Sequence, residues 1–400
     1  MAIGDTIRIK REELGMTQKE LADKLFVSRQ TVSRWESGSR CPDLIISRKI
    51  ASTLGLSMDE LIPSQDESFA RRDEKTEDNE TVFAGFDCGG SNTRCMLVSK
   101  DGRILGRGKG GPSNYLFCGK LAARDALKES IKEAFADASL PPRELKGAFI
   151  ASAAVEVFCG SSHESFFKEV TGCRNVECNS DVFPVWYAGS RFEPAVVMIA
   201  GTGSVAYLLE GKGFVKANGW GPLFGDEGSG YYIGINAIRR VSQMTDRRRA
   251  LDEEFCNALL EHFNVPRETP RQLLRILNQS DYQKRAASAT EVVLRLYETG
   301  NTNATELIND AAEELACSIN ALAERANGSF SLILSGGLLQ NDTPLRRILL
   351  EKVSVINNIS KIVTPKCDAV LSAAAIALRS NGYDDAAERL MRLAGGAPLC

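Results

Sequence analysis

Two glycine-rich turns contain the residues of this chain that could bind a phosphorylated ligand. Gly89-Gly90-Ser91-Asn92-Thr93 follows one apolar stretch, and Gly201-Thr202-Gly203 follows another. Glycine accepts positive φ and has no Cβ, so consecutive backbone N–H groups can converge on an anion. Neither turn opens a helix, which argues against a dinucleotide-binding fingerprint, and the Gly-x-x-x-x-Gly-Lys-Ser/Thr pattern is missing. Either turn alone is equally well explained as an ordinary hairpin, but the pair favours two phosphate-binding hairpins.

The elements that must position these turns follow from the apolar pattern around them. Alternation predicts strands at 82–87, 93–99 and 103–108, a helix at 120–138 and a strand at 147–153. A second series of hairpin-linked strands spans roughly 195–216, so the two halves form a degenerate internal repeat. Beyond it we expect helices near 228–243, 249–263, 283–298 and 303–327, a strand at 330–334, a short helix from Thr343, a strand at 361–364 and a helix at 368–378. The sequence thus predicts an α/β protein of two lobes with a cleft between them.

The first sixty residues have a different pattern, that of short helices separated by tight turns. Thr17 followed by Glu20 predicts a capping box, and Ser28 predicts the start of a second capped helix. Val32 and Trp35 form the inner face of that helix. The polar side chains on its outer face are Arg29, Gln30, Ser33 and Arg34. Arg and Gln can bind guanine and adenine edges in the major groove, and Gln18 at another helix start suits a phosphate oxygen.

Length and composition limit the class of protein. Four hundred residues suggest two or three domains, and the net charge is −3. The chain shows no apolar run of membrane-spanning length and no signal peptide, so we expect a cytoplasmic protein. Its eleven cysteines are scattered without a Cys-x-x-Cys pair, and it has two histidines. This usage favours reduced thiols over disulfides or a zinc site.

The N-terminal residues resemble the lambda-repressor/Cro-like (XRE) helix-turn-helix family over residues 3–62. The matching segments are Thr17-Gln18, Leu21-Ala22, residues 27–33, Trp35-Glu36, Gly38, Pro42 and residues 54–61. The resemblance implies binding of operator DNA as a homodimer, through Gln18, Arg29, Gln30, Ser33 and Arg34. A helical bundle for oligomerisation or partner binding is the alternative.

Residues 82–380 resemble the BadF-type ATPase and N-acetylglucosamine kinase family, which has the bilobal, ribonuclease-H-like fold of actin-like ATPases. The resemblance rests on residues 85–94, 111–114, 201–204, 219–230 and 333–341. We therefore expect an all-α helix-turn-helix domain at 1–63, a charged flexible linker at 64–81, a first α/β lobe at 82–195 and a second lobe with the C-terminal helices at 196–400.

The resemblance also implies roles for single residues. ATP phosphates and nucleoside would be held by Gly89, Gly90, Ser91, Asn92, Thr93, Gly201, Thr202, Gly203, Gly336 and Gly337. Mg²⁺ would be held, directly or through water, by Asp87 and Asp181, because this ion takes only one or two carboxylates. An amino sugar such as N-acetylglucosamine would contact Asn114, Gly219, Trp220 and Asp226. Taken singly, Asp181 or Asn114 is better explained as a capping or turn residue.

The general base of the family lies in an Ala-Gly-x-Asp-like segment, and this chain departs from it. The aligned residues are Ala153-Ala154-Val155-Glu156, with Glu156 at the aspartate position. The extra methylene moves the carboxylate by more than an ångström, and a misplacement of that size costs about a hundredfold in rate. Three hypotheses follow: a transcription regulator with ATP and an amino sugar as effectors, an active N-acetylhexosamine kinase with a DNA-binding module, and an activator of a radical dehydratase. The third would need iron–sulfur cysteines in a shared motif, which we do not find.

Overall fold

The computed structural model divides into two compact units, Met1–Lys75 and Thr76–Cys400. It describes residues 3–25, 27–36, 42, 44–54, 56, 81–90, 92–156, 162–211, 213–276, 280–366 and 368–393. The predicted linker at 64–81 lies outside these residues except for Thr81. Among the described residues, no helix is both long enough and apolar enough to cross a membrane.

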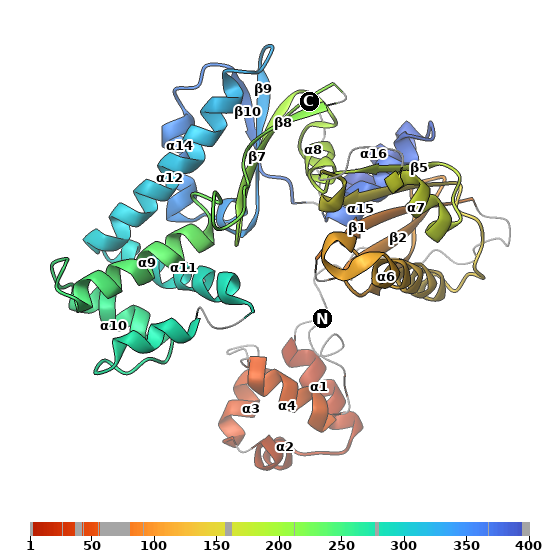
Figure 1. The fold of residues 1–400 in the computed structure, drawn as a ribbon. Helices are drawn as coiled ribbons and strands as arrows, with labels where there is room; N and C mark the ends of the chain where they lie inside the picture. The colour runs from red at the N-terminus through yellow and green to blue at the C-terminus, as the bar shows by residue number, and fades with distance from the viewer. Residues whose placement is uncertain are drawn as a thin grey trace. The chain divides into compact units, whose positions relative to one another are not determined.

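The described part of the first unit contains four short helices (Figure 1), which share one apolar core. They are α1 (Ile3–Glu13), α2 (Gln18–Leu25), α3 (Arg29–Glu36) and α4 (Leu44–Leu54). The capping box is confirmed, because Thr17 N donates to Glu20 Oε2 at 2.7 Å and Glu20 N to Thr17 Oγ1 at 3.2 Å. Its core is formed by Ile7, Leu21, Ala22, Leu25, Val32, Trp35, Ile50, Ala51 and Leu54.

The second unit contains two five-stranded sheets with the same strand order. The first sheet, in the order β3-β2-β1-β4-β5, is built from β1 (Val82–Cys88), β2 (Thr93–Ser99), β3 (Ile104–Gly110), β4 (Gly147–Ser152) and β5 (Val176–Asn179). The second, in the order β10-β9-β6-β7-β8, is built from β6 (Ala195–Ala200), β7 (Ser204–Glu210), β8 (Gly213–Asn218), β9 (Phe330–Ser335) and β10 (Ile359–Val363). In each sheet three antiparallel strands are followed by two strands parallel to the first. The predicted internal repeat and the α/β fold class are therefore confirmed.

The helices of the second unit pack against these sheets or against one another. The first half contributes α6 (Tyr115–Asp137, interrupted at Gly119), the 3-10 turn η2 (Ala153–Glu156), α7 (Ser162–Thr171) and α8 (Val182–Ser190). The second half contributes α9 (Gly230–Thr245), α10 (Glu253–His262), η3 (Pro270–Ile276), α11 (Tyr282–Glu298), α12 (Thr302–Ala323), α13 (Gly337–Gln340) and α14 (Pro344–Val353). The chain continues with α15 (Ala369–Arg379) and α16 (Asp384–Leu393). The sequence patterns did not predict α7, β5, α8, α13 or α16.

The C-terminal helices pack on the first sheet, although we expected them with the second lobe. Helix α15 contacts β1 and β4, and α16 packs against α15. Their apolar side chains share a core with Phe83 and Phe149 of the first sheet and with Val197 and Ile333 of the second. The cause lies in the sequence of α15, whose residues from Val370 to Leu378 are all buried. A helix that is apolar on every side is stable only where protein surrounds it.

Candidate functional site

Helix α3 presents a polar face to solvent in the first unit. Arg29, Gln30, Ser33 and Arg34 are exposed, whereas Val32 and Trp35 are buried in the core. Ser28 caps the helix, since Thr31 N donates to Ser28 Oγ at 3.2 Å. The predicted inner and outer faces of this helix are confirmed, and the outer face has the donors and acceptors that base edges require.

A buried ion pair fixes α3 against α1, and no sequence pattern predicted it. Arg11 donates to Glu36 through Nε at 2.6 Å and through Nη2 at 3.1 Å. Its hydrogen bond to Glu36 raises the pKa of the Arg11 side chain. Gln18 Nε2 also donates to Glu36, at 2.9 Å. The Gln18 side chain, which we expected to meet phosphate, is therefore oriented by this pair at the start of α2.

The first glycine turn is bound to the loop that precedes α6. Gly89 N donates to Asn92 O at 3.0 Å, and Gly89 O accepts from Ser113 N at 3.2 Å and from Asn114 N at 3.3 Å. The fully buried Thr93 hydroxyl donates to Gly111 O at 2.7 Å. This hydroxyl therefore points into the protein, which differs from the expectation that it faces a phosphate. The buried Asn114 lies next to the turn, whereas Ser91 lies outside the described residues.

The strand register brings three predicted site segments to one edge of the first sheet. Asp87 pairs with Ala151 of β4, and Ala151 pairs with Asn179 of β5. The carboxyl ends of these parallel strands lead into the first glycine turn, the η2 turn that ends at Glu156, and Asp181. Open α/β sheets bind ligands beyond the carboxyl ends of their strands. The backbone of Glu156 is described at this edge, but its side chain is not.

Asp87 is already paired with a cation. Arg94, directly opposite on β2, donates to Asp87 Oδ2 from Nη2 at 2.6 Å and lies 2.7 Å from Asp368 Oδ1. Burial alone would lower the pKa of Arg94, but the two carboxylates raise it. Asp181 is exposed, and its Oδ1 accepts from Ser180 Oγ at 3.3 Å. Two carboxylates with water fit Mg²⁺, although Arg94 competes with a cation for Asp87 Oδ2.

The second glycine turn is held by the start of α9. Gly201 O accepts from Gly230 N at 2.8 Å, and Thr202 O accepts from Tyr231 N at 3.0 Å. With these carbonyls directed at the helix, the N–H groups of Thr202 and Gly203 find no acceptor among the described residues. Two consecutive amide donors without a protein acceptor form an arrangement that suits a phosphate oxygen.

Asn218 organises the loop from Gly219 to Glu227, and sequence reasoning missed it. Its Oδ1 accepts from Gly219 N at 2.7 Å and from Asp226 N at 2.8 Å. Its Nδ2 donates to Ser204 Oγ and to Glu227 O, each at 3.1 Å. The one available signal was an asparagine directly before Gly219, a residue type that tolerates the left-handed conformation found at Asn218, where φ is 62°.

The Asp226 carboxylate lies against the second glycine turn. A Cβ at Gly203 would meet Asp226 Oδ2 at 2.9 Å, so a larger residue there would require this carboxylate to shift. Burial raises the pKa of Asp226, while backbone hydrogen bonds from Ser204 and Gly221 oppose that shift. Trp220 in the same loop is 77% exposed, so in this conformation its ring lines no enclosed pocket. Asn114 and Asp226 thus lie beside the first and the second turn, respectively.

Gly336 brings two strands of the second sheet to the same edge. Ser335 of β9 pairs with Ile199 of β6, and the next residue, Gly336, has φ +86°. A Cβ there would overlap the Ala200 carbonyl, so no other residue fits. Gly337, which starts α13, has no atom within 4 Å of an added Cβ. The edge therefore presents bare backbone at Gly336 and Gly337 next to the second glycine turn.

The model of the BadF/BadG/BcrA/BcrD ATPase family matches residues 84–377. The chain belongs to this family. A helix-turn-helix family model matches residues 7–61 of the first unit. Family membership confirms the two resemblances drawn from the sequence, including the actin-like ATPase fold of the second unit.

Curated relatives match the two units separately. An N-acetylmuramic acid/N-acetylglucosamine kinase of Clostridium acetobutylicum is 26% identical over 299 residues, 73% of this chain and 97% of that protein. An N-acetyl-D-glucosamine kinase of Dictyostelium discoideum is 25% identical over 321 residues, 75% of this chain and 98% of that protein. An uncharacterised helix-turn-helix transcriptional regulator of Methanothermobacter thermautotrophicus is 49% identical over 49 residues, 12% of this chain and 71% of that protein.

Solved structures confirm the fold of the BadF-type unit. The crystal structure of a protein of Chromobacterium violaceum, assigned as an N-acetylglucosamine kinase, superposes with a TM-score of 0.56 at 21% identity. The superposition covers 76% of this chain and 100% of the Chromobacterium violaceum chain. At this identity the similarity establishes the fold alone.

Proposed function

We propose that this protein is a DNA-binding transcriptional regulator whose BadF-type unit binds ATP, with Mg²⁺, and an amino sugar such as N-acetylglucosamine as effectors. The observation that supports this proposal most is the combination in one chain of a helix-turn-helix unit with an exposed polar recognition helix and a unit of the BadF-type ATPase family. The ligands would shift the second unit between an open and a closed state, and this shift would change the affinity for DNA. The size of the shift depends on how much more tightly the ligands bind one state than the other.

ATP binding is supported by the two glycine turns. The turn at Gly89 and the turn at Gly201 end the equivalent first strands, β1 and β6, of the two sheets. The N–H groups of Thr202 and Gly203 would bind phosphate oxygens, and Gly337 would lie against the nucleoside. Asp87 and Asp181 would hold Mg²⁺, which neutralises phosphate charge when bound.

Amino-sugar binding is supported by the relatives and by the loop that Asn218 organises. The two kinases with the whole-unit matches are named for amino sugars. Asn114 and Asp226 would hydrogen-bond sugar hydroxyls, and the exposed ring of Trp220 would cover the sugar together with Gly219. The Asp226 carboxylate lies against Gly203 of the second glycine turn, and the backbone N–H of Asp226 is held by Asn218 Oδ1 at 2.8 Å.

An active N-acetylhexosamine kinase is the second candidate, and the edge of the first sheet favours it. The η2 turn brings Glu156 to the edge that also carries Asp87 and Asp181, where a base for the sugar hydroxyl belongs. We place it second because glutamate stands where the family has aspartate.

Release of ADP by purified full-length protein with Mg-ATP and N-acetylglucosamine distinguishes the two functions. We expect no turnover above background for the native protein and for Glu156→Ala. Turnover of about 1 s⁻¹ or more that disappears in Glu156→Ala would establish the kinase and contradict the pure sensor. The matched variant Glu156→Asp restores the side chain of the family, so a gain of turnover in this variant alone would confirm that the glutamate suppresses catalysis.

DNA recognition is tested on α3. We expect the protein to bind its operator as a homodimer and Arg29→Ala to weaken binding by about 1–3 kcal/mol. Arg325→Ala, which removes an exposed arginine at the end of α12 in the other unit, is the matched control. Unchanged binding in Arg29→Ala would show that α3 does not read the operator.

A further inference from the structure

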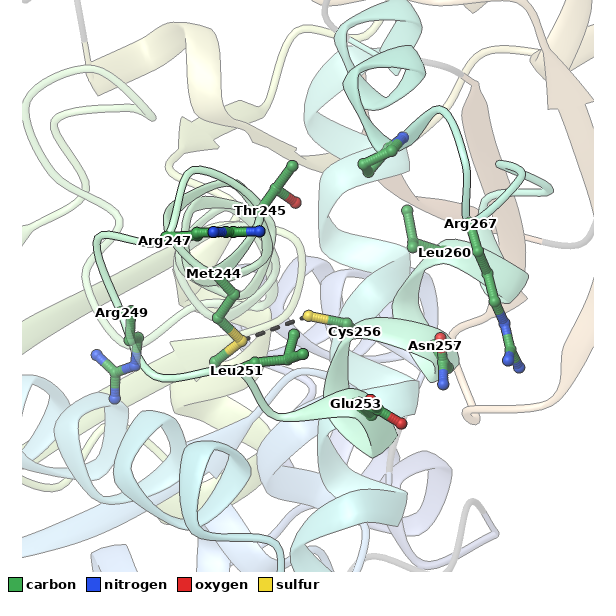
Figure 2. A pocket seen from close by; sticks show the side chains of 11 residues that line it. Met244, Thr245, Arg247, Arg249, Leu251, Glu253, Cys256, Asn257, Leu260 and Arg267 are labelled. Atoms are coloured by element: carbon green, nitrogen blue, oxygen red, sulfur yellow. Dashed lines mark hydrogen bonds between the residues drawn. The ribbon is translucent and has the colours of Figure 1, made fainter.

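A separate pocket lies at the carboxyl end of α9 (Figure 2), whereas the second glycine turn lies at the start of this helix. Its volume is about 680 Å³, within the range of small-molecule sites. It is lined by Met244, Thr245, Arg247, Arg249, Leu251, Glu253, Cys256, Asn257, Leu260, Arg267 and Pro270. We call it the arginine pocket.

Two guanidinium groups that line the pocket have no partner among the described residues. Arg247 and Arg267 lie on opposite sides of the pocket in Figure 2. Neither side chain has a hydrogen bond or ion pair with any residue that the structure describes, and both are exposed. Glu253 is the one acidic residue among those that line the pocket, against three arginines. The pocket is therefore positive in a chain whose net charge is −3.

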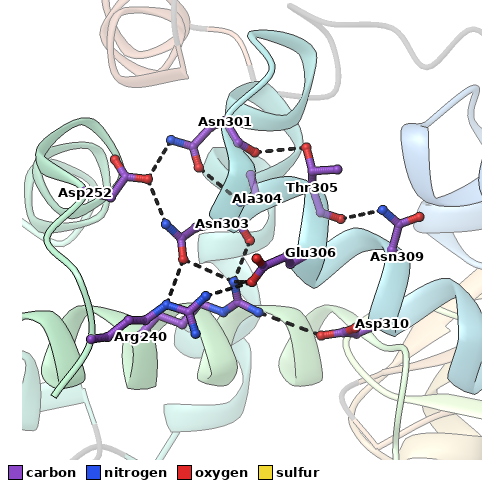
Figure 3. Close-up of polar contacts among 10 residues, drawn as sticks. Arg240, Asp252, Asn301, Asn303, Ala304, Thr305, Glu306, Asn309 and Asp310 are labelled. Carbon is purple, nitrogen blue, oxygen red and sulfur yellow. Dashed lines mark hydrogen bonds and ion pairs between the residues drawn. The ribbon is translucent and has the colours of Figure 1, made fainter.

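The third arginine, Arg249, is fixed by Asn303 and Glu306 of α12. Figure 3 shows these two residues in a polar network with Asp252. Arg249 donates to Asn303 Oδ1 at 3.0 Å and to Glu306 Oε2 at 2.7 Å. Asn303 Nδ2 in turn donates at 2.8 Å to Asp252, whose Oδ1 caps α10 by accepting from Phe255 N at 3.0 Å. The loop that carries Arg249, and Arg247 two residues before it, is thus held by α12 and by the start of α10.

The pocket also has an apolar component. Cys256 and Met244 face each other, with the thiol 3.4 Å from the Met244 sulfur, as the dashed line in Figure 2 shows. Leu260 and Pro270 add apolar surface, and Leu251 is 64% exposed at the rim. A free inorganic anion would contact the arginines but leave the apolar surface exposed to water. An anionic group on a carbon skeleton would contact the arginines and bury the apolar surface as well.

We propose that the arginine pocket binds a small organic phosphate, of the size of a sugar phosphate or a mononucleotide, as an effector. Planar guanidinium groups bind phosphate through two parallel hydrogen bonds. A phosphate group has three terminal oxygens, one more than a carboxylate, so it has more acceptors for two arginines at once. The lining has no paired carboxylates and no glycine turn, so it supports binding and not group transfer. Helix α9 joins the pocket to the second glycine turn, which gives the occupant a route to the nucleotide site.

Calorimetric titration of the full-length protein tests this proposal. The probes are N-acetylglucosamine 6-phosphate and AMP, with inorganic phosphate and neutral N-acetylglucosamine for comparison. Each titration is made with a non-hydrolysable ATP analogue and N-acetylglucosamine already saturating the other sites. We expect one of the organic phosphates to bind under these conditions, and to bind more weakly at high salt because the contact is ionic.

Arg247→Ala/Arg267→Ala should weaken that binding at least tenfold, whereas Arg325→Ala should not. Because neither arginine side chain has a hydrogen bond or ion pair with a described residue, we expect the double variant to have the same Tm as the native protein. Three results would overturn the proposal: no binding of either organic phosphate, equal binding by the double variant, or competition with the ATP analogue or the sugar. The titration involves neither DNA nor turnover, so its failure is distinct from failure of the proposed function.

Discussion

Replacing Gly336 by alanine tests whether the second sheet must bring β6 and β9 into close contact at the nucleotide edge. The backbone at Gly336 has φ +86°, and an added Cβ would overlap the carbonyl group of Ala200. Alanine must therefore either adopt a disfavoured conformation or push β9 away from β6. Both responses disturb the edge at which we place the ATP phosphates.

The size of the effect follows from two terms. The left-handed conformation costs an L-residue about 1–2 kcal/mol. An extra methyl group in a packed site costs about 1–3 kcal/mol more. The sum is about 2–5 kcal/mol in the free energy of unfolding, which lowers the Tm of a large domain by roughly 4–10 °C.

Gly337→Ala is the matched control, because an added Cβ there meets no atom within 4 Å. Thermal unfolding should show a lower Tm for Gly336→Ala and the native Tm for Gly337→Ala. Calorimetry with a non-hydrolysable ATP analogue should then show weaker binding by both variants, since a side chain at either position narrows the nucleoside surface. Equal Tm values for the two variants would refute the packing argument. A native affinity of Gly337→Ala for the nucleotide would show that the nucleoside does not lie against Gly337.

Other variants test further contacts. Glu36→Leu leaves the buried Arg11 guanidinium with only the exposed Glu12 carboxylate as a counter-charge. It should destabilise the first unit by about 3–5 kcal/mol, whereas the double variant with Arg11→Met should lose less, as denaturant titration would show. Asn218→Ala should weaken amino-sugar binding, measured by calorimetry, with a smaller effect on ATP, because the loop that carries Asp226 loses four hydrogen bonds. Burial acts to raise the pKa of Asp252, yet hydrogen bonds from Phe255 N and two asparagines hold this pKa below its usual value. Its stabilising contribution is therefore present above the unfolded pKa of about 3.9 and is lost as pH falls through the lower folded value, so Asp252→Asn should weaken the acid dependence of unfolding.

The sequence predicted the elements whose side chains repeat regularly. Alternation and glycine turns located β1 to β3 and β6 to β8 because a hairpin is a local structure. Capping chemistry located α2 and α3 for the same reason. By contrast, α8 was missed because Val182–Ser190 is apolar on most sides and contains a proline, so it has neither helical nor strand periodicity.

The contacts that organise the site join residues distant in sequence, and periodicity says nothing about such pairs. Arg11 and Glu36 are 25 residues apart, and Ser204 and Asn218 are 14 apart. Arg94 was visible in the glycine motif, but its link to Asp368 depends on where α15 packs. The close approach of Gly336 to Ala200 likewise required the pairing of β6 with β9.

The affinity of the full-length protein for its operator, measured by fluorescence anisotropy with and without Mg-ATP and N-acetylglucosamine, tests the central claim most directly. A fragment of its own promoter region, chosen by footprinting, provides the DNA. We predict at least a tenfold change in operator affinity when both ligands are present, and none in a variant carrying Asp226→Ala. Operator affinity that stays the same with and without the ligands, in a protein that binds both, would contradict the account.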